Sequence, residues 1–192
     1  MSTPGPIKRH AMACPDPQGS FSFVRPGEID QESMLTHLRD PSIARHLPLL
    51  PDKPDRSLVQ SIIANKEESW IHDGLGHWGI LHEGRYAGWG GFQREAEEWD
   101  FGLVLRRDYF RQGRIIASMA FEWARRDTDI EAVTFLLPMT RSRRALQRLG
   151  AVPIGVCDIS GIPFRKWSLA LDAIPRPAPG EQGRRANFDD VA

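Results

Sequence analysis

Residues 99–126 constrain the fold more than any other stretch, because the pattern changes there from strand to helix within a few positions. Alternate residues from Trp99 to Leu105 are large and apolar, which predicts a strand with one buried face and with Asp100 on the other face. A polar turn follows at 106–111, and Gly113 comes soon after it. From Ile115 onward, apolar residues recur at three- and four-residue steps and predict an amphipathic helix. The chain therefore passes from a strand, through a basic turn, into the first turn of a helix.

The start of this predicted helix suits an anion. Backbone N–H groups in the first turn of a helix have no partner within the helix, and the helix dipole is positive there, so a phosphate fits. Gly113 lets the backbone come close to a ligand, and Arg111 and Arg114 flank it with positive charge. The alternative interpretation is that a glycine between a strand and a helix is only a tight connection.

Charge is balanced over the chain but not along it. The 192 residues carry a formal net charge of zero, so no global attraction to nucleic acid or to a membrane surface is implied. Residues 106–148, however, contain ten arginines and five acidic residues, a local charge of +5 that suits an anionic cofactor. The alternative is a set of solvated helix faces. We expect no nucleic-acid partner, because the arginines lack interleaved aromatics and a reading motif.

Other function classes are disfavoured by what the sequence lacks. It has no apolar run near 18 residues and no signal-peptide core, so we expect a cytoplasmic protein without a membrane partner. Cys14 and Cys157 are the two cysteines, and a structural disulfide between them is not expected. No Cys/His cluster has zinc spacing, so we expect no metal. The oligomeric state stays open, with a homodimer as one option.

The remaining patterns predict one domain between two tails. Prolines among small and polar residues at 1–19, and again at 173–192, are typical of loose tails. Residues 20–172 read, in order, as strand, helices, three strands, helix, strand, helix and two strands. This order predicts an α/β fold with a mixed, mostly antiparallel central sheet flanked by helices, rather than a doubly wound one.

Two motifs resemble a known family. Residues 100–113, DFGLVLRRDYFRQG, fit the run E-I-G-Y-W-L-x-P-E-Y-W-G-Q-G without a gap, with Asp100 at the glutamate position. Residues 139–151 fit the run N-x-x-S-x-x-V-L-x-K-L-G-F, with Ser142, Leu146, Leu149 and Gly150 matching. The chain thus resembles the GNAT superfamily of N-acetyltransferases, in the branch that includes the ribosomal-protein N-terminal acetyltransferases. The resemblance covers roughly residues 21–171.

The resemblance implies an acyl-CoA transferase fold with acetyl-CoA as co-substrate and an amine as acceptor. It implies that the pantetheine arm pairs with the central strand, and it assigns Ser142 to the cofactor side of the site. The residues that it implies for the cofactor are Leu103, Val104 and Leu105 for pantetheine, and Arg111, Gln112, Gly113, Arg114, Ile115 and Ile116 for pyrophosphate. The chain departs from the family pattern at three positions, which are Phe110, Ile115 and Met139.

Acetyl transfer to an amine also needs a base. An amine with a pKa of about 10.4 is only about 0.04% neutral at pH 7, equivalent to roughly 4–5 kcal/mol. A carboxylate can remove its proton, directly or through a water molecule. Asp100 is the first candidate, and Glu98, on the same strand face, is the second. The alternative is that these acids form the solvated end of a hairpin. The tyrosine that serves some branches as general acid is replaced by Leu146.

Two functions remain open from the sequence. The first is an N-acetyltransferase that moves an acetyl group from acetyl-CoA to a primary amine on a small molecule, a peptide or a protein N-terminus. The second is a degenerate module of the same fold, which binds CoA or a partner without transferring anything. The losses at Phe110, Ile115 and Met139 favour the second, whereas the matches at Gly113 and Gly150 favour the first.

Overall fold

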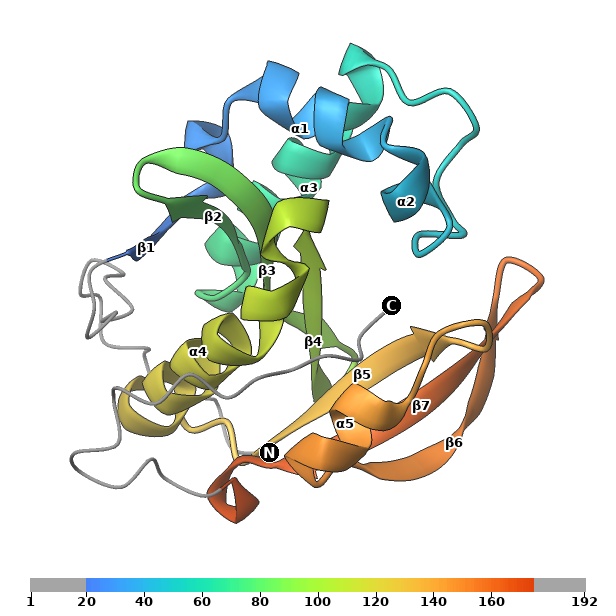
Figure 1. Ribbon diagram of the computed structural model, residues 1–192. Coiled ribbons are helices and arrows are strands. Elements are labelled where there is room, and N and C mark those ends of the chain that lie inside the picture. Colours follow the sequence, from blue (N-terminus) through green and yellow to red (C-terminus); the bar gives the residue numbers. More distant parts are fainter. Residues whose placement is uncertain (1–19, 175–192) are drawn as a thin grey trace.

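A seven-stranded sheet forms the centre of the protein (Figure 1). This computed structural model describes residues 20–174, so the predicted tail at 1–19 and most of the one at 173–192 lie outside the described residues. The strand order is β1-β2-β3-β4-β5-β7-β6. The strands are β1 (Phe21–Val24), β2 (His77–His82), β3 (Arg85–Glu95), β4 (Glu98–Leu105), β5 (Ala132–Pro138), β6 (Val152–Ile159) and β7 (Ile162–Ala170). The helices are η1 (Pro26–Glu28), α1 (Gln31–Leu38), α2 (Pro41–Ala44), α3 (Arg56–Asp73), η2 (Arg107–Gln112), α4 (Gly113–Asp127), α5 (Arg144–Leu149) and η3 (Leu171–Ala173).

The sheet is antiparallel except at one junction. β3 and β4 pair along eight residues, from Gly88 with Leu105 to Glu95 with Glu98. β4 and β5 are parallel and share a single pair, Asp100 with Thr134. Beyond that pair the two strands diverge, as Figure 1 shows, with β4 leading to α4 and β5 leading to α5. The mixed, mostly antiparallel α/β fold expected from the sequence is confirmed.

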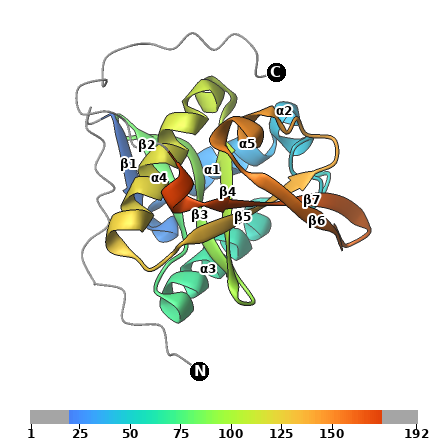
Figure 2. The same cartoon turned by 90° about the horizontal axis from the view of Figure 1, so that it is seen from below.

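Helices cover both faces of the sheet (Figure 2). α4 and α5 lie on one face, where Leu146 of α5 joins the same apolar cluster as α4 and β5. α1 and α3 lie on the other face, where Met34 and Val59 pack with Trp89 of β3. The expected alternation of β4 is confirmed, since Phe101 and Leu105 belong to the first cluster and Val104 packs against the second.

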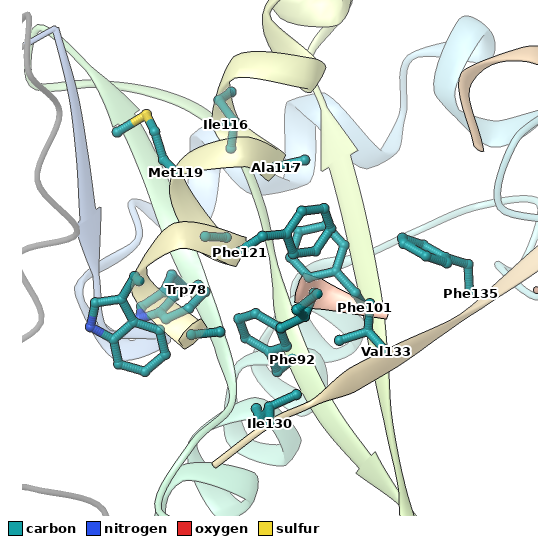
Figure 3. Packing of buried hydrophobic residues seen from close by; sticks show 14 of the residues in the cluster. Trp78, Phe92, Phe101, Ile116, Ala117, Met119, Phe121, Ile130, Val133 and Phe135 are labelled. Atoms are coloured by element: carbon teal, nitrogen blue, oxygen red, sulfur yellow. The ribbon is translucent and has the colours of Figure 1, made fainter. Parts of the chain in front are cut away.

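The core beneath α4 is aromatic. Phe121 of α4 points at Phe101 of β4, with ring centroids 4.6 Å apart, and Phe135 of β5 closes the group (Figure 3). Trp78 of β2 packs edge-on to Trp123 at 5.3 Å. Burying rings of this size supplies much of the hydrophobic stabilisation of the domain. These contacts also fix α4 over β4, which sets where the first turn of α4 begins.

Local signals placed most element ends correctly. Asp30 and Asp55 cap α1 and α3 by accepting hydrogen bonds from Ser33 and Leu58, and Gly150 ends α5 with φ of 85°. The sequence also predicts a helix over residues 141–149, with Thr140 as its cap, because threonine is a common cap residue. This prediction is wrong at the start of the helix, since α5 begins at Arg144 after a turn. The polar turn at 106–111 is a 3₁₀ helix, η2, that runs directly into α4.

Two further findings bear on function. Within the described range 20–174, no helix is both long and apolar enough to span a membrane. In the same range, no three His, Cys, Asp or Glu side chains gather in a way that could hold a metal ion.

Candidate active site

Asp100 lies at the apex of the gap between β4 and β5. The Thr134 hydroxyl donates a hydrogen bond of 3.1 Å to Asp100 Oδ1, and the two residues are also the single backbone pair of these strands. Burial raises the pKa of Asp100 to about 6, although the Thr134 hydrogen bond opposes the rise. A carboxylate with a pKa near 6 is mostly ionised at pH 7 and is a stronger base than an exposed aspartate.

Alternate residues of β4 turn their backbone groups away from β3 and toward the gap. The Arg106 N–H donates to the Ala87 carbonyl at 2.8 Å, so these two residues form a hydrogen-bonded pair. Such pairs alternate along an antiparallel ladder, and the β3–β4 register has no break. Val104 therefore turns its N–H and C=O toward β3, whereas Leu103 and Leu105 turn theirs toward the gap. Of the three predicted pantetheine residues, Leu103 and Leu105 turn their backbone groups toward the gap, whereas the Val104 side chain packs against the second apolar cluster.

The first turn of α4 starts close to the end of β4. Gly113 adopts ordinary helical angles, with φ of −54°. A Cβ built on it would lie 3.6 Å from Leu105 Cδ1 and 3.8 Å from Leu103 Cδ2, which are normal contacts. The fold itself thus tolerates alanine at position 113, which favours a ligand-related reason for the glycine. Arg111 and Arg114 are exposed on either side, and the first turn of α4 carries no acidic residue.

The three departures from the family pattern have distinct settings. Phe110 packs against the core, and its ring meets that of His46, after α2, at a centroid distance of 6.3 Å. Ile115 is 53% exposed in the first turn of α4, so its side chain lies at the surface and not in the core. Met139 lies exposed after β5, in the same turn as Ser142. Leu146, at the position of the absent general acid, is buried in the core.

Glu98 has a different environment from Asp100. Its carboxylate binds the Lys166 ammonium of β7, and both side chains are partly exposed at the rim. The structure thus brings both predicted carboxylates to one face of β4, and Asp100 has the better environment for a base.

Three polar residues beside Asp100 escaped the sequence analysis. Lys66 of α3 binds the side-chain amide oxygen of Gln93, which is the cross-strand partner of Asp100. His77 of β2 is fully buried, and its ring lies against Gly102. Thr134 is the polar residue in the otherwise apolar run of β5, which was the one available signal. Lys66 and His77 had none, because their separation from Asp100 along the chain is large.

A recess of about 660 Å³ lies elsewhere, between the end of α1 and residue 54. Leu38, Ala44, Leu47 and Pro51 are among its lining residues, and no predicted site residue is. Arg39 holds its edge by donating a hydrogen bond to the Pro54 carbonyl at 3.0 Å. The recess is lined by the end of α1, by α2 and by the loop that follows α2.

Comparison with known proteins identifies the fold. No family model matches the sequence, and no curated protein matches it either. Among solved structures, a GNAT-family acetyltransferase of Bacillus anthracis superposes with a TM-score of 0.63, at 11% identity, over 80% of this chain and 96% of the other. The chain has the GNAT fold.

Two more structures carry the same fold. An acetyltransferase of Agrobacterium tumefaciens strain C58 gives a TM-score of 0.63 at 14% identity, over 79% of this chain and 91% of the other. RimL, a ribosomal-protein α-N-acetyltransferase, gives a TM-score of 0.62 at 13% identity, over 79% of this chain and 91% of the other. The resemblance to GNAT proteins is therefore confirmed at the level of the fold, at identities that leave the chemistry of this chain to its own residues.

Proposed function

We propose that this GNAT-fold chain is an N-acetyltransferase that moves an acetyl group from acetyl-CoA to a primary amine on a small molecule, a peptide or a protein N-terminus. The observation that carries the proposal is Asp100, a half-buried carboxylate with a raised pKa at the apex of the β4–β5 gap. A base at that point stands beside the backbone edge that a thioester ligand would use.

The residues present fit the co-substrate. The backbone groups of Leu103 and Leu105 face the gap and can pair with an extended, amide-bearing arm as an added strand does. The first turn of α4, from Gly113 to Ile116, with Arg111 and Arg114 beside it, suits a pyrophosphate. Ser142 lies after β5, across the same gap. When bound, the co-substrate supplies an acetyl group activated as a thioester.

Asp100 accepts the proton of the incoming ammonium, directly or through a water molecule, and the neutral amine is then the nucleophile. The strand edge and the helix turn hold the two reactants together, which supplies much of the rate. The chain offers no tyrosine near the leaving group, since Leu146 occupies that position. A CoA thiol is acidic enough to leave without one, because thiols ionise near pH 8–9.

The second candidate is a module that binds CoA or a partner without catalysis. The exposed Ile115 at the turn where phosphate would bind favours it, because a branched side chain crowds the approach. The two candidates differ in what the purified protein does with acetyl-CoA.

Calorimetric titration with acetyl-CoA, and separately with CoA, tests the proposal. We expect binding at micromolar concentrations, lost in Arg111→Glu and retained in Asp100→Asn. A screen of amines, with thiol release as the readout, follows on the wild type. Binding without turnover on any amine would favour the module. The absence of binding at millimolar concentration would contradict both candidates as CoA proteins.

A further inference from the structure

Two lysines bind residues next to Asp100, one on the β3 side of β4 and one on its β5 side. On the β3 side, Lys66 of α3 reaches Gln93, the residue directly across the ladder from Asp100. On the β5 side, Lys166 of β7 reaches Glu98, two positions along β4 on the same face. Both ammonium groups attract the charged form of Asp100, since each lowers the pKa of that carboxyl.

Lys66 is half-buried, and the group that its ammonium contacts is neutral. Burial lowers the pKa of Lys66, while Glu95 and Asp100 raise it. The hydrogen-bond acceptor that it reaches is an amide oxygen, so its charge is not cancelled by a direct ion pair. A buried charge acts more strongly on its neighbours than an exposed one, because water screens it less.

A small cavity borders the Lys66 side chain. Lys66 lines it together with His77, Trp78 and Trp89, and its volume is about 10 Å³. This is roughly the room that one water molecule needs. That cavity therefore has no room for a substrate group, and the Lys66 ammonium contacts Gln93.

The other titratable groups around Asp100 are Glu95, His77 and Glu98, and they supply no positive charge that would stabilise its ionised form. Glu95, at the end of β3, raises the pKa of Asp100. His77, whose ring lies against Gly102, is fully buried, and burial lowers its pKa well below the usual range, so it is neutral. Glu98 is bound to Lys166. The positive charges that face Asp100 thus come from α3 and β7.

We propose that Lys66 and Lys166 are positioning residues that keep Asp100 ionised at neutral pH, so that it is ready to accept the amine proton. This inference rests on the proposed function, in which Asp100 is the base. Burial alone favours the neutral carboxyl, which cannot accept a proton. The two lysines oppose burial from either side, at positions outside both sequence motifs.

A titration of the Asp100 carboxyl tests the inference without co-substrate or acceptor. Carboxyl-¹³C aspartate NMR follows each aspartate with pH, and Asp100→Asn identifies the resonance. Wild type is expected to titrate near pH 6. Lys66→Met and Lys166→Met should each move the midpoint upward by about 0.5–1 pH unit, and the double variant further. Lys66→Arg and Lys166→Arg should keep it near the wild-type value.

Matched controls separate charge from packing. Arg56→Met removes an exposed cation at the start of α3, where it pairs with Glu32, and should leave the midpoint unchanged. Lys166→Met combined with Glu98→Gln removes both members of the rim pair, so an upward shift there reports loss of the lysine and not an unpaired glutamate. Lys66→Gln replaces Lys66→Met if the latter does not fold.

An Asp100 midpoint that stays at the wild-type value in both lysine-to-methionine variants would overturn the inference. Activity gives an independent readout: the acidic limb of kcat/KM should move with the NMR midpoint. If the midpoint moves while no amine is acetylated, the lysines do control Asp100 and the proposed function is the part that fails.

Discussion

Opposing interactions set the pKa of Asp100. Burial at the strand junction favours its neutral form, whereas the Thr134 hydroxyl and the two lysines favour its charged form. The balance leaves a pKa of about 6. A pKa just below neutral suits a base, because the group is ionised at pH 7 and yet holds a proton better than an exposed aspartate.

Asp100→Asn should abolish this base while sparing the site. We expect kcat to fall by about 10²-fold or more, with the affinity for acetyl-CoA unchanged. In wild type, kcat/KM should fall as pH drops through about 6, since protonated Asp100 cannot accept a proton. In the variant, this fall of kcat/KM in acid should vanish, and the pH optimum of the reaction should move to higher pH. Unchanged turnover would remove Asp100 from the mechanism.

Gly113 is a residue that the fold does not require. Gly113→Ala should keep the structure, and stability should stay level or rise by up to about 1 kcal/mol, because alanine is the better helix former. The affinity for CoA should fall by about tenfold or more if the pyrophosphate approaches this backbone. Thermal denaturation and calorimetry on the same sample measure both. Normal CoA affinity in the variant would move the phosphate site elsewhere.

At the scale of elements, the site arises from the parting of two parallel strands. β4 pairs fully with β3 but shares one residue pair with β5, and the two strands diverge beyond it. A strand edge inside a sheet, and not at its rim, is thereby left for a ligand. The strand, the helix turn and the base are brought together by this single divergence.

Amide hydrogen exchange measures whether the N–H groups on the gap-facing edge of β4 are hydrogen-bonded. In the free protein the N–H groups of Leu103 and Leu105 should exchange much faster than those of Gly102 and Val104, which bond to β3. Adding CoA should protect Leu103 and Leu105 selectively. Uniform protection along β4 without CoA would mean that the edge is already closed and that the arm binds elsewhere.

At the scale of the whole molecule, buried titratable groups make stability depend on pH in opposing ways. Burial lowers the pKa of His37 to about 4 and that of His77 well below 6.5, so the unfolded chain binds their protons first as pH falls. Both histidines therefore destabilise the fold in acid. Asp100, with its raised pKa, is protonated first in the folded state, and this stabilises the fold as pH falls from about 6 toward 4.

Two variants should separate these effects in urea unfolding at pH 7 and pH 5. His37→Gln should make the free energy of unfolding less sensitive to acid. The variant lacks the destabilisation caused by proton binding to His37 in the unfolded chain, which amounts to up to about 3 kcal/mol between pH 6.5 and 4. Asp100→Asn should make the free energy of unfolding more sensitive to acid, because the stabilisation from protonating Asp100 in the folded state is lost. Parallel pH dependence in wild type and both variants would show that these groups titrate alike in the folded and unfolded chains.

The sequence by itself determined the elements and their order. Alternation along β4, the apolar stripe of α4, aspartate caps and turn glycines are local signals, and local signals survive without the fold. The motif around Gly113 also indicated the GNAT fold, and it singled out Asp100 as the carboxylate on the face of β4 opposite the core. The start of α5 was misjudged, because Thr140 has the residue type of a cap but lies in a turn.

Only the tertiary structure decided how Asp100 differs from Glu98. Thr134, Lys66 and Lys166 come from three elements far apart along the chain, and their effect on a carboxyl depends on distance and burial. Electrostatic interactions act through space, so no pattern of neighbouring residues encodes them. The sequence therefore named Asp100 as the candidate base, together with the strand edge beside it, and the packing of α3, β5 and β7 around Asp100 set its electrostatic environment.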